Sequence, residues 1–68
     1  MDQPYIELNN FLKINNIVAT GGQAKVLIKS GQVSVNGSVE TRTRKKLIVG
    51  DKVTYNNQNL LVTDEVVR

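Results

Sequence analysis

The chain has 68 residues, a formal net charge of +3 at pH 7, and neither cysteine nor histidine. A chain of this length buries only about 60% of its unfolded surface, so we expect one small domain covering residues 1–68. Without cysteine or histidine the sequence allows no disulfide and no ordinary zinc site, and we expect neither a metal nor a cofactor.

The positive charge is concentrated in one part of the sequence. Residues 13–46 hold seven cations and one acid, which gives +6, whereas the remaining residues hold two cations and five acids, which gives −3. Such an imbalance is typical of proteins that bind a polyanion, with chance clustering on a solvated surface as the alternative. The N-terminus is acidic and no aliphatic run exceeds three residues, so we expect a cytoplasmic protein without a membrane segment.

A short strand followed by a helix is predicted at the start of the chain. The residues before Leu8 contain the only proline and fit a brief edge strand. Leu8, Phe11 and Leu12 have the i, i+3, i+4 spacing of an amphipathic helix, and this spacing predicts that Phe11 lies in the core. The asparagine pair at 9–10 favours the start of this helix, and the pair at 15–16 favours its end.

A second helix is marked by the residues at its ends. Thr20 and Gln23 have the spacing of a capping box, in which each side chain satisfies a backbone amide near the other. Gly31 supplies the left-handed residue that commonly follows a helix. Three apolar residues line one face between these ends: Ala24, Leu27 and Ile28.

The rest of the chain alternates with the period of strands. Asn-Gly at 36–37 is a strong hairpin signal. A two-residue turn would place Val39 opposite Ser34, whereas a three-residue loop would place it opposite Val35, and we expect the latter because it puts Val39 in the core. Two further runs are joined through residues 56–59. The expected fold class is α+β, with two short helices packed on a small antiparallel sheet.

The stretch GGQAKVLIKSGQVSVNGSVETRTRKKLIVGDKV, residues 21–53, resembles the S-four RNA-binding domain. That domain is named from ribosomal small-subunit protein four, and its core is also called the alpha-L motif. The resemblance is carried by a helix of the form QAxxLIxxG, then VxVNG, then a basic segment and a GD turn. It covers residues 6–55, with ELNNFLK similar to the first helix of the family, and the chain looks like a small stand-alone bacterial member.

The resemblance implies the alpha-L fold and binding of structured RNA. The start of the second helix and the following hairpin would make the contacts. This chain has two glycines where many members have arginine or another polar residue. The glycines either remove phosphate contacts or let an RNA backbone approach the free amides closely. Carried over by position, the implied RNA-binding residues are Thr20, Gly21, Gly22, Lys25, Asn36, Gly37 and Ser38.

Residues 40–46, ETRTRKK, hold four cations within five positions. If the segment is extended, Arg42, Arg44 and Lys46 form a row on one face, about 7 Å apart, with Thr43 and Lys45 on the other face. Successive phosphates of a nucleic-acid strand have a similar spacing. Protection of an edge strand is the alternative, but four cations exceed that need. We therefore predict that the row binds phosphates.

Lys25 and Lys29 lie four residues apart on the polar face of the second helix. Their mutual repulsion costs a few tenths of a kcal/mol, and a bound phosphate would turn that cost into attraction. An ordinary solvated face is the alternative. We include both lysines in the predicted RNA-binding surface.

The residue types predict a binding module and not an enzyme. The sequence shows no nucleophile paired with a base and no phosphate-binding loop. Three aromatic residues are too few for a base-stacking platform, so recognition of folded RNA by shape and phosphate contacts is expected.

The expected partner is a structured RNA, such as ribosomal RNA or a transfer-RNA-like fold, bound by a monomer in association with the ribosome or another ribonucleoprotein. A small adaptor for an acidic protein is the main alternative, and a basic surface alone also allows DNA binding. Ubiquitin-like sulfur carriers share such hairpins but end in Gly-Gly, whereas this sequence ends in Val66-Val67-Arg68, which argues against a carrier.

Overall fold

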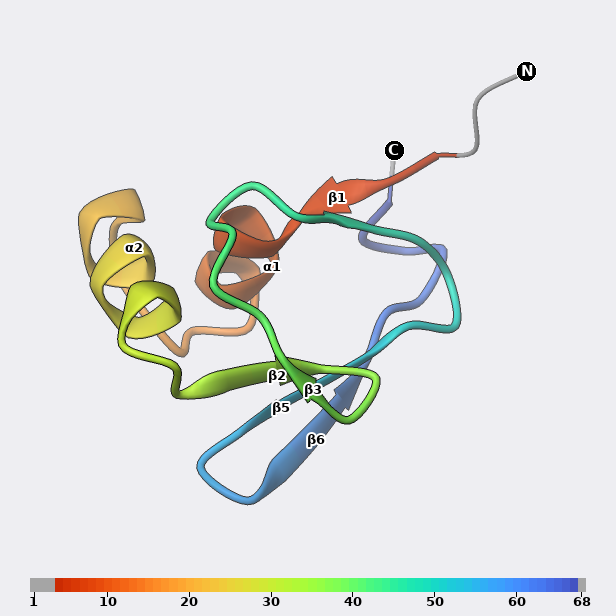
Figure 1. Ribbon diagram of the computed structural model, residues 1–68. Coiled ribbons are helices and arrows are strands. Elements are labelled where there is room, and N and C mark those ends of the chain that lie inside the picture. The colour runs from red at the N-terminus through yellow and green to blue at the C-terminus, as the bar shows by residue number, and fades with distance from the viewer. Residues whose placement is uncertain (1–3, 68) are drawn as a thin grey trace.

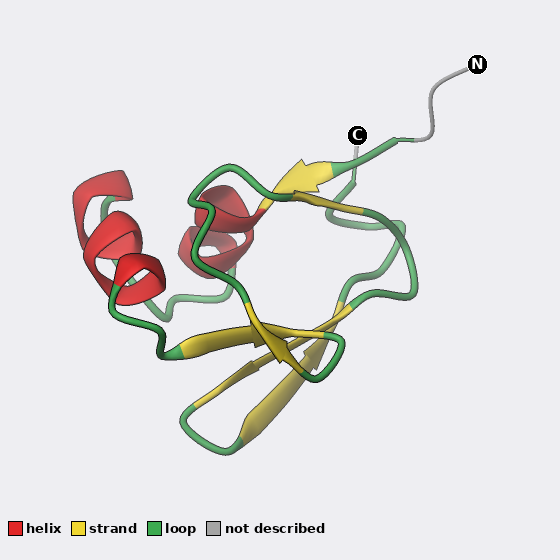
Figure 2. Cartoon of the chain, viewed as in Figure 1, coloured by secondary structure: helices red, strands yellow, loops and turns green. Residues whose placement is uncertain are grey.

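The computed structural model describes residues 4–67 and has the predicted α+β architecture (Figure 1). Both helices lie on the same side of a four-stranded sheet, and a two-stranded ladder lies beside the first helix (Figure 2). The elements of the described residues, in chain order, are β1 (Ile6–Glu7), α1 (Leu8–Ile14), α2 (Gly21–Lys29), β2 (Val33–Val35), β3 (Ser38–Val39), β4 (Lys46–Leu47), β5 (Lys52–Tyr55) and β6 (Gln58–Leu61).

The strands form two separate antiparallel sheets. The larger has the order β3-β2-β5-β6, and in the smaller β1 pairs with β4, with Ile6 opposite Leu47. After β3 the chain leaves the larger sheet, passes the start of α1 and reaches β1 (Figure 1). Residues 40–46, which we call the basic loop, therefore lie on the helical side of the molecule.

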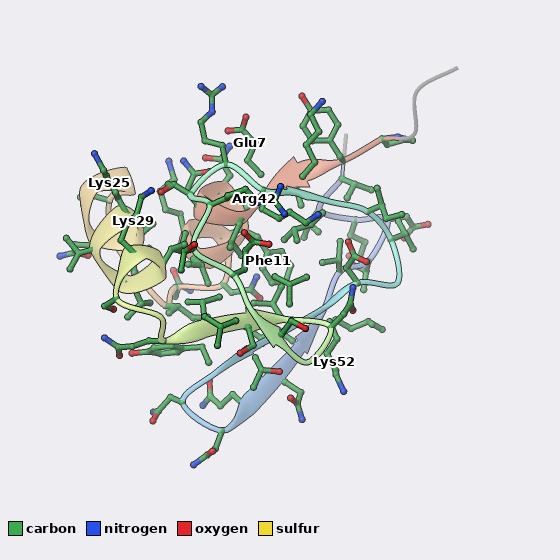
Figure 3. The ribbon with its side chains drawn as sticks, in the orientation of Figure 1. Glu7, Phe11, Lys25, Lys29, Arg42 and Lys52 are labelled. Atoms are coloured by element: carbon green, nitrogen blue, oxygen red, sulfur yellow. The ribbon has the colours of Figure 1, made fainter. Side chains whose placement is uncertain are left out.

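The core lies between the helices and the larger sheet. Phe11 is fully buried there, as the helical spacing predicted (Figure 3). Burial of one such side chain contributes about 1.5–3 kcal/mol at most, so apolar packing is the main source of stability in this small fold. The largest fully buried side chains are Phe11, Leu8, Leu12, Ile28, Leu47, Val33, Val53 and Val62.

Helix α2 has the ends that the sequence predicts. Thr20 is the N-cap, and its Oγ1 accepts a hydrogen bond from the Gln23 amide at 3.2 Å. The Gln23 side chain accepts from the amide of Ala19 at 2.8 Å, one residue before the N-cap. Gly31 follows the helix with φ of 82°, the left-handed conformation that glycine adopts without strain. The capping prediction is confirmed, with the reciprocal bond shifted by one residue.

Helix α1 covers the predicted apolar spacing from Leu8 and ends where predicted, but the asparagine pair does not mark its start. Asn15 is its C-cap, and Asn16 follows in the left-handed conformation with φ of 60°. The helix starts at Leu8 instead of at the asparagine pair, and the N-cap Glu7 makes no capping bond with its side chain. The amides of its first two residues, Leu8 and Asn9, are satisfied from outside the helix, by the basic loop.

The β2–β3 hairpin has a two-residue turn, so the predicted three-residue loop is wrong. Val39 lies opposite Ser34 and is 63% exposed, instead of facing Val35 in the core. Asn36 and Gly37 have φ of 53° and 88°, the conformation that a tight type I′ turn requires. The twist of this turn matches the twist of the strands, and the match outweighs the burial of one valine.

The β5–β6 hairpin is also tighter than the sequence predicts. Asn56 and Asn57 alone form its turn, with φ of 52° and 65°, and Tyr55 lies opposite Gln58. Gln58 and Asn59, which were expected in the connection, belong to β6. Asparagine tolerates the left-handed region better than most residues, so this turn needs no glycine.

Candidate nucleic-acid interface

The basic loop is not the extended strand that its alternation predicted. Only its last residue, Lys46, belongs to a strand. Residues 43–44 form a turn, and the Lys45 amide donates to the Arg42 carbonyl at 3.3 Å. A straight row of Arg42, Arg44 and Lys46 needs strand geometry throughout, so that prediction is wrong.

Helix α1 supplies the reason for the turn. The first amides of a helix have no partner within it. Here the amides of Leu8 and Asn9 donate to the carbonyl oxygens of Lys45 and Thr43, at 2.9 Å and 3.1 Å. The loop bends so that its carbonyls meet these amides, and this tertiary demand cannot be seen in the spacing of the loop's own residues.

Two carboxylates hold the arginines of the basic loop. Arg42 Nε lies 2.9 Å from Oε2 of Glu40, and its Nη2 donates to the other oxygen of Glu40 at 3.3 Å. Arg44 Nε lies 3.1 Å from Oε2 of Glu7, which comes from β1. The arginine side chains are still 72% and 78% exposed, so the pairs orient them without closing them to a ligand.

The Arg42–Glu40 pair affects the charge of both groups. The hydrogen bond from Arg42 lowers the pKa of the Glu40 carboxyl below its ordinary value. The same bond raises the pKa of the Arg42 guanidinium. Both groups are therefore ionised around pH 7, and the loop presents a fixed pattern of charge.

Two lysines of α2 and two arginines of the basic loop surround one hollow. Lys25 and Lys29 lie four residues apart on α2, so they share one face of the helix, beside the buried Ala24 and Ile28. Figure 3 shows Lys25 and Lys29 on α2 and Arg42 on the neighbouring basic loop. The hollow has a volume of about 480 Å³ and is lined by Asn9, Lys25, Lys29, Arg42, Thr43 and Arg44.

A second hollow, of about 390 Å³, shares Arg42 and Arg44 with the first and is completed by Lys45 and Lys46. We call the two hollows together the basic groove. Its six cations include the two arginines that are paired with Glu40 and Glu7, and these two carboxylates reduce the net charge of the surface to +4. A concave surface lined by one sign of charge attracts oppositely charged ligands and raises their local concentration.

The predicted residues at the start of α2 lie at a different hollow. Thr20 and Gly22 line a largely apolar space of about 550 Å³ together with Leu27 and Tyr55. Apart from its chain neighbours and the backbone of its own helix, no atom of the described residues lies within 4 Å of the position that a Cβ would take on Gly21. Contact of Thr20, Gly21 and Gly22 with RNA stays a prediction.

The predicted residues of the hairpin lie away from the basic groove. The β2–β3 turn is at the end of β2 remote from α2 (Figure 1). The Asn36 side chain donates to Asp51 at 3.1 Å and accepts from the Lys52 amide at 2.9 Å, so it joins the turn to the start of β5. RNA contact by Asn36, Gly37 and Ser38 also stays a prediction.

Two polar residues of the groove are not among the RNA-binding residues predicted from the sequence. Asn9 Oδ1 and Thr43 Oγ1 are buried and have no hydrogen-bond partner, and both residues line the hollow between α2 and the basic loop. Alternation placed Thr43 on an inner face, which signalled burial but no function. Asn9 was expected only to help start a helix. Lys45, expected on the face opposite the cation row, also lines the groove.

The aromatic rings of the described residues do not form a stacking platform. Lys46 Nζ lies 4.9 Å from the centroid of the Tyr5 ring, Phe11 is in the core, and Tyr55 is partly buried against it. Residues 4–67 hold no cluster of three side chains suited to a metal ion. Neither helix of this part of the chain has the length and apolar character needed to cross a membrane.

Comparison with known proteins relates this chain to a family. Residues 1–63 match the model of the S4 domain. "Putative RNA-binding protein YbcJ" of Escherichia coli (strain K12) is 41% identical over 59 residues, which cover 87% of this chain and 84% of that protein. "Probable ribosome maturation protein RlbA" of Bacillus subtilis (strain 168) is 38% identical over 53 residues, which cover 78% of this chain and 75% of that protein.

The solution structure of YbcJ from E. coli has the same fold. It superposes with a TM-score of 0.67 at 38% sequence identity, covering 93% of this chain and 80% of that one, and it is reported to reveal an ALFAL motif involved in RNA-binding. The S-four resemblance and the alpha-L fold are thereby confirmed, and S4 domains are non-catalytic binding modules. Agreement in both sequence and fold along most of the chain shows that it belongs to the S4 domain family.

Proposed function

We propose that this chain binds structured RNA through the basic groove. The observation that carries the proposal is the convergence of Lys25 and Lys29 with Arg42 and Arg44 around one hollow. Arginine can bind a phosphate with two parallel hydrogen bonds, and lysine binds it as a point charge. Neutralised phosphates release counterions, which supplies much of the affinity for nucleic acid. The name of the relative YbcJ supports RNA as the polyanion.

The arrangement of the cations favours a folded RNA. They come from a helix and a bent loop, and they surround a hollow instead of following a line. Such an arrangement can contact phosphates of two backbone segments that a folded RNA holds side by side. Because the relative RlbA is named for ribosome maturation, we propose ribosomal RNA as the ligand, which would place the protein in the cytoplasm.

Charge removal on each side of the groove tests the proposal. One variant carries Lys25→Gln and Lys29→Gln, and another carries Arg42→Gln and Arg44→Gln. Each lost phosphate contact lowers the slope of log affinity against log salt by about 0.7 to 0.9, so each double variant should lower it by roughly 1.5. Affinity should fall for every RNA sequence tested, because phosphate contacts carry no sequence information.

Lys52→Gln is the matched control. Lys52 is an exposed cation on the larger sheet, away from α2 and the basic loop (Figure 3). The substitution removes one charge, as each of the two changes in a double variant does. It should leave the slope of log affinity against log salt unchanged. Wild-type slopes in both double variants would exclude the basic groove as the RNA-binding surface.

A further inference from the structure

The basic groove contains two buried oxygens that the folded chain does not use. Asn9 Oδ1 and Thr43 Oγ1 have almost no contact with solvent and no hydrogen-bond partner. One backbone hydrogen bond joins the two residues, from the Asn9 amide to the Thr43 carbonyl at 3.1 Å. The unused groups are therefore side-chain atoms of two residues held together by α1 and the basic loop.

Unpaired buried polar atoms are rare in folded proteins, because each one has lost its water without gaining a partner. These two occur together, and both residues line the same hollow as Lys25, Lys29 and the two arginines. A ligand that brings a hydrogen-bonding group next to a phosphate would satisfy both oxygens while the cations bind the phosphate.

We propose that this pair recognises the ribose 2′-hydroxyl, so that the groove distinguishes RNA from DNA. A hydroxyl has one proton to donate and can also accept. The 2′-hydroxyl would donate to Asn9 Oδ1 and accept from the Thr43 hydroxyl, while the adjacent phosphate lies against the cations. Deoxyribose offers neither bond, and the 2′-hydroxyl is the group by which proteins tell RNA from DNA. The inference rests on the proposed RNA-binding function and names the chemical group that the groove selects.

Binding must include a small side-chain movement. Because the two oxygens are shielded in the free protein, Asn9 and Thr43 have to rotate toward the groove as the ligand enters. Thr43 lies in the turn of the basic loop, outside any helix or strand, and its hydroxyl makes no hydrogen bond that a rotation of the side chain would break. The ligand then satisfies atoms that the free protein leaves unpaired.

The test uses one RNA hairpin in two forms, with ordinary ribose and with 2′-fluoro sugars. The fluoro form keeps the sugar pucker and phosphates of RNA but has no proton to donate. The wild-type protein should bind ordinary RNA roughly 25-fold more tightly, because fluorine cannot donate and accepts poorly, and each of the two lost hydrogen bonds is worth about fivefold. Thr43→Val has the same shape without the hydroxyl, and it should reduce that ratio to roughly fivefold, because ordinary RNA keeps the bond to Asn9 Oδ1.

Two controls separate recognition from folding. Thr41→Val changes an exposed threonine of the same loop and should keep the wild-type ratio. Thr43→Val should be at least as stable as the wild type in urea, because a methyl group replaces an unpaired buried hydroxyl. A loss of stability would mean that the hydroxyl has a structural partner, which would overturn the proposal.

The outcomes for this inference and for RNA binding itself are distinct. Tight, salt-dependent binding of both RNA forms with equal affinity overturns only the ribose inference, as does a Thr43→Val protein that keeps the wild-type ratio. Absence of salt-dependent binding to either form overturns the proposed function as well. A ratio of roughly 25 that falls to roughly fivefold in Thr43→Val and persists in Thr41→Val supports both.

Discussion

Two carboxylates lie within the most basic surface of the described residues. Glu40 and Glu7 each accept a hydrogen bond from an arginine that lines the basic groove. A phosphate approaching Arg42 or Arg44 therefore meets a guanidinium that is already oriented but partly neutralised. At the scale of single residues, the groove balances the orientation of its arginines against their strength as phosphate ligands.

Glu40→Gln should bind RNA more tightly than the wild type. The change removes a negative charge beside Arg42 and keeps the length of the side chain. We expect affinity to rise by a factor of roughly two to five at low salt and by less at high salt. Binding titrations at several salt concentrations would measure it, with Glu65→Gln, an exposed acid near the end of the chain, as the control. Weaker binding would mean that Glu40 is needed to hold Arg42 in place.

The same variant links the ion pair to pH. Because Arg42 lowers the pKa of Glu40 from its ordinary 4.5, the ionised carboxylate stabilises the fold above pH 4.5. This contribution is lost as the pH falls through the lowered pKa. Urea unfolding should show a wild type more stable than Glu40→Gln at pH 7, with the difference shrinking toward pH 3. A constant difference would contradict the ion pair as its cause.

At the scale of elements, the two helices are stabilised at their starts in different ways. Helix α2 carries its own N-cap in Thr20, whereas the first amides of α1 are capped by the basic loop. A change in the cap of α2 should therefore act on folding, while a change in the basic loop acts on α1 and on the groove together. The position of the cations depends on α1 through this capping.

Thr20→Ala should lower the free energy of unfolding by about 1 kcal/mol, because the Gln23 amide loses its acceptor. Gly22→Ala, two residues later, should act in the opposite direction and raise it by about 0.4–1 kcal/mol, since the only atom near its new methyl group is Thr20 Oγ1 at 3.9 Å. Urea unfolding without RNA would measure both. Unchanged stability in Thr20→Ala would show that the hydroxyl does not cap the helix.

At the scale of the whole molecule, recognition has to depend on charge and shape. The three rings of the described residues are engaged with a lysine, with the core, or partly buried, so bases of a single strand find no row of exposed rings. The basic groove instead presents cations from two directions, an arrangement suited to the rigid, highly charged surface of a folded RNA.

Structured RNA should therefore bind more tightly than an unstructured strand of the same length. Gel-shift titrations at one fixed salt concentration would compare a stable RNA hairpin with an oligonucleotide of equal length that cannot pair with itself. Equal or tighter binding of the unstructured strand would contradict recognition by shape, even if the salt dependence confirmed contacts with phosphate.

Most of the elements could be predicted because their signals lie within a few neighbouring residues. Thr20 with Gln23 set the start of α2, the spacing around Phe11 set the buried face of α1, and the motif QAxxLIxxG followed by VxVNG indicated the family. The register of Val39 was predicted wrongly, because burial was given more weight than the geometry of the Asn-Gly turn. At that turn the local chemistry of Asn-Gly was the better guide, although it competed with the burial of Val39.

The sequence by itself determined which residues carry the charge and that Lys25 and Lys29 share a helix face. Only the tertiary structure decided where the basic loop lies, because the amides of Leu8 and Asn9 draw its carbonyls into a turn. The bend replaces a straight row of cations by a shallow groove that α2 borders on the other side. Residues far apart in the chain meet there because α1 must satisfy its first amides, and no local pattern in the sequence records that requirement.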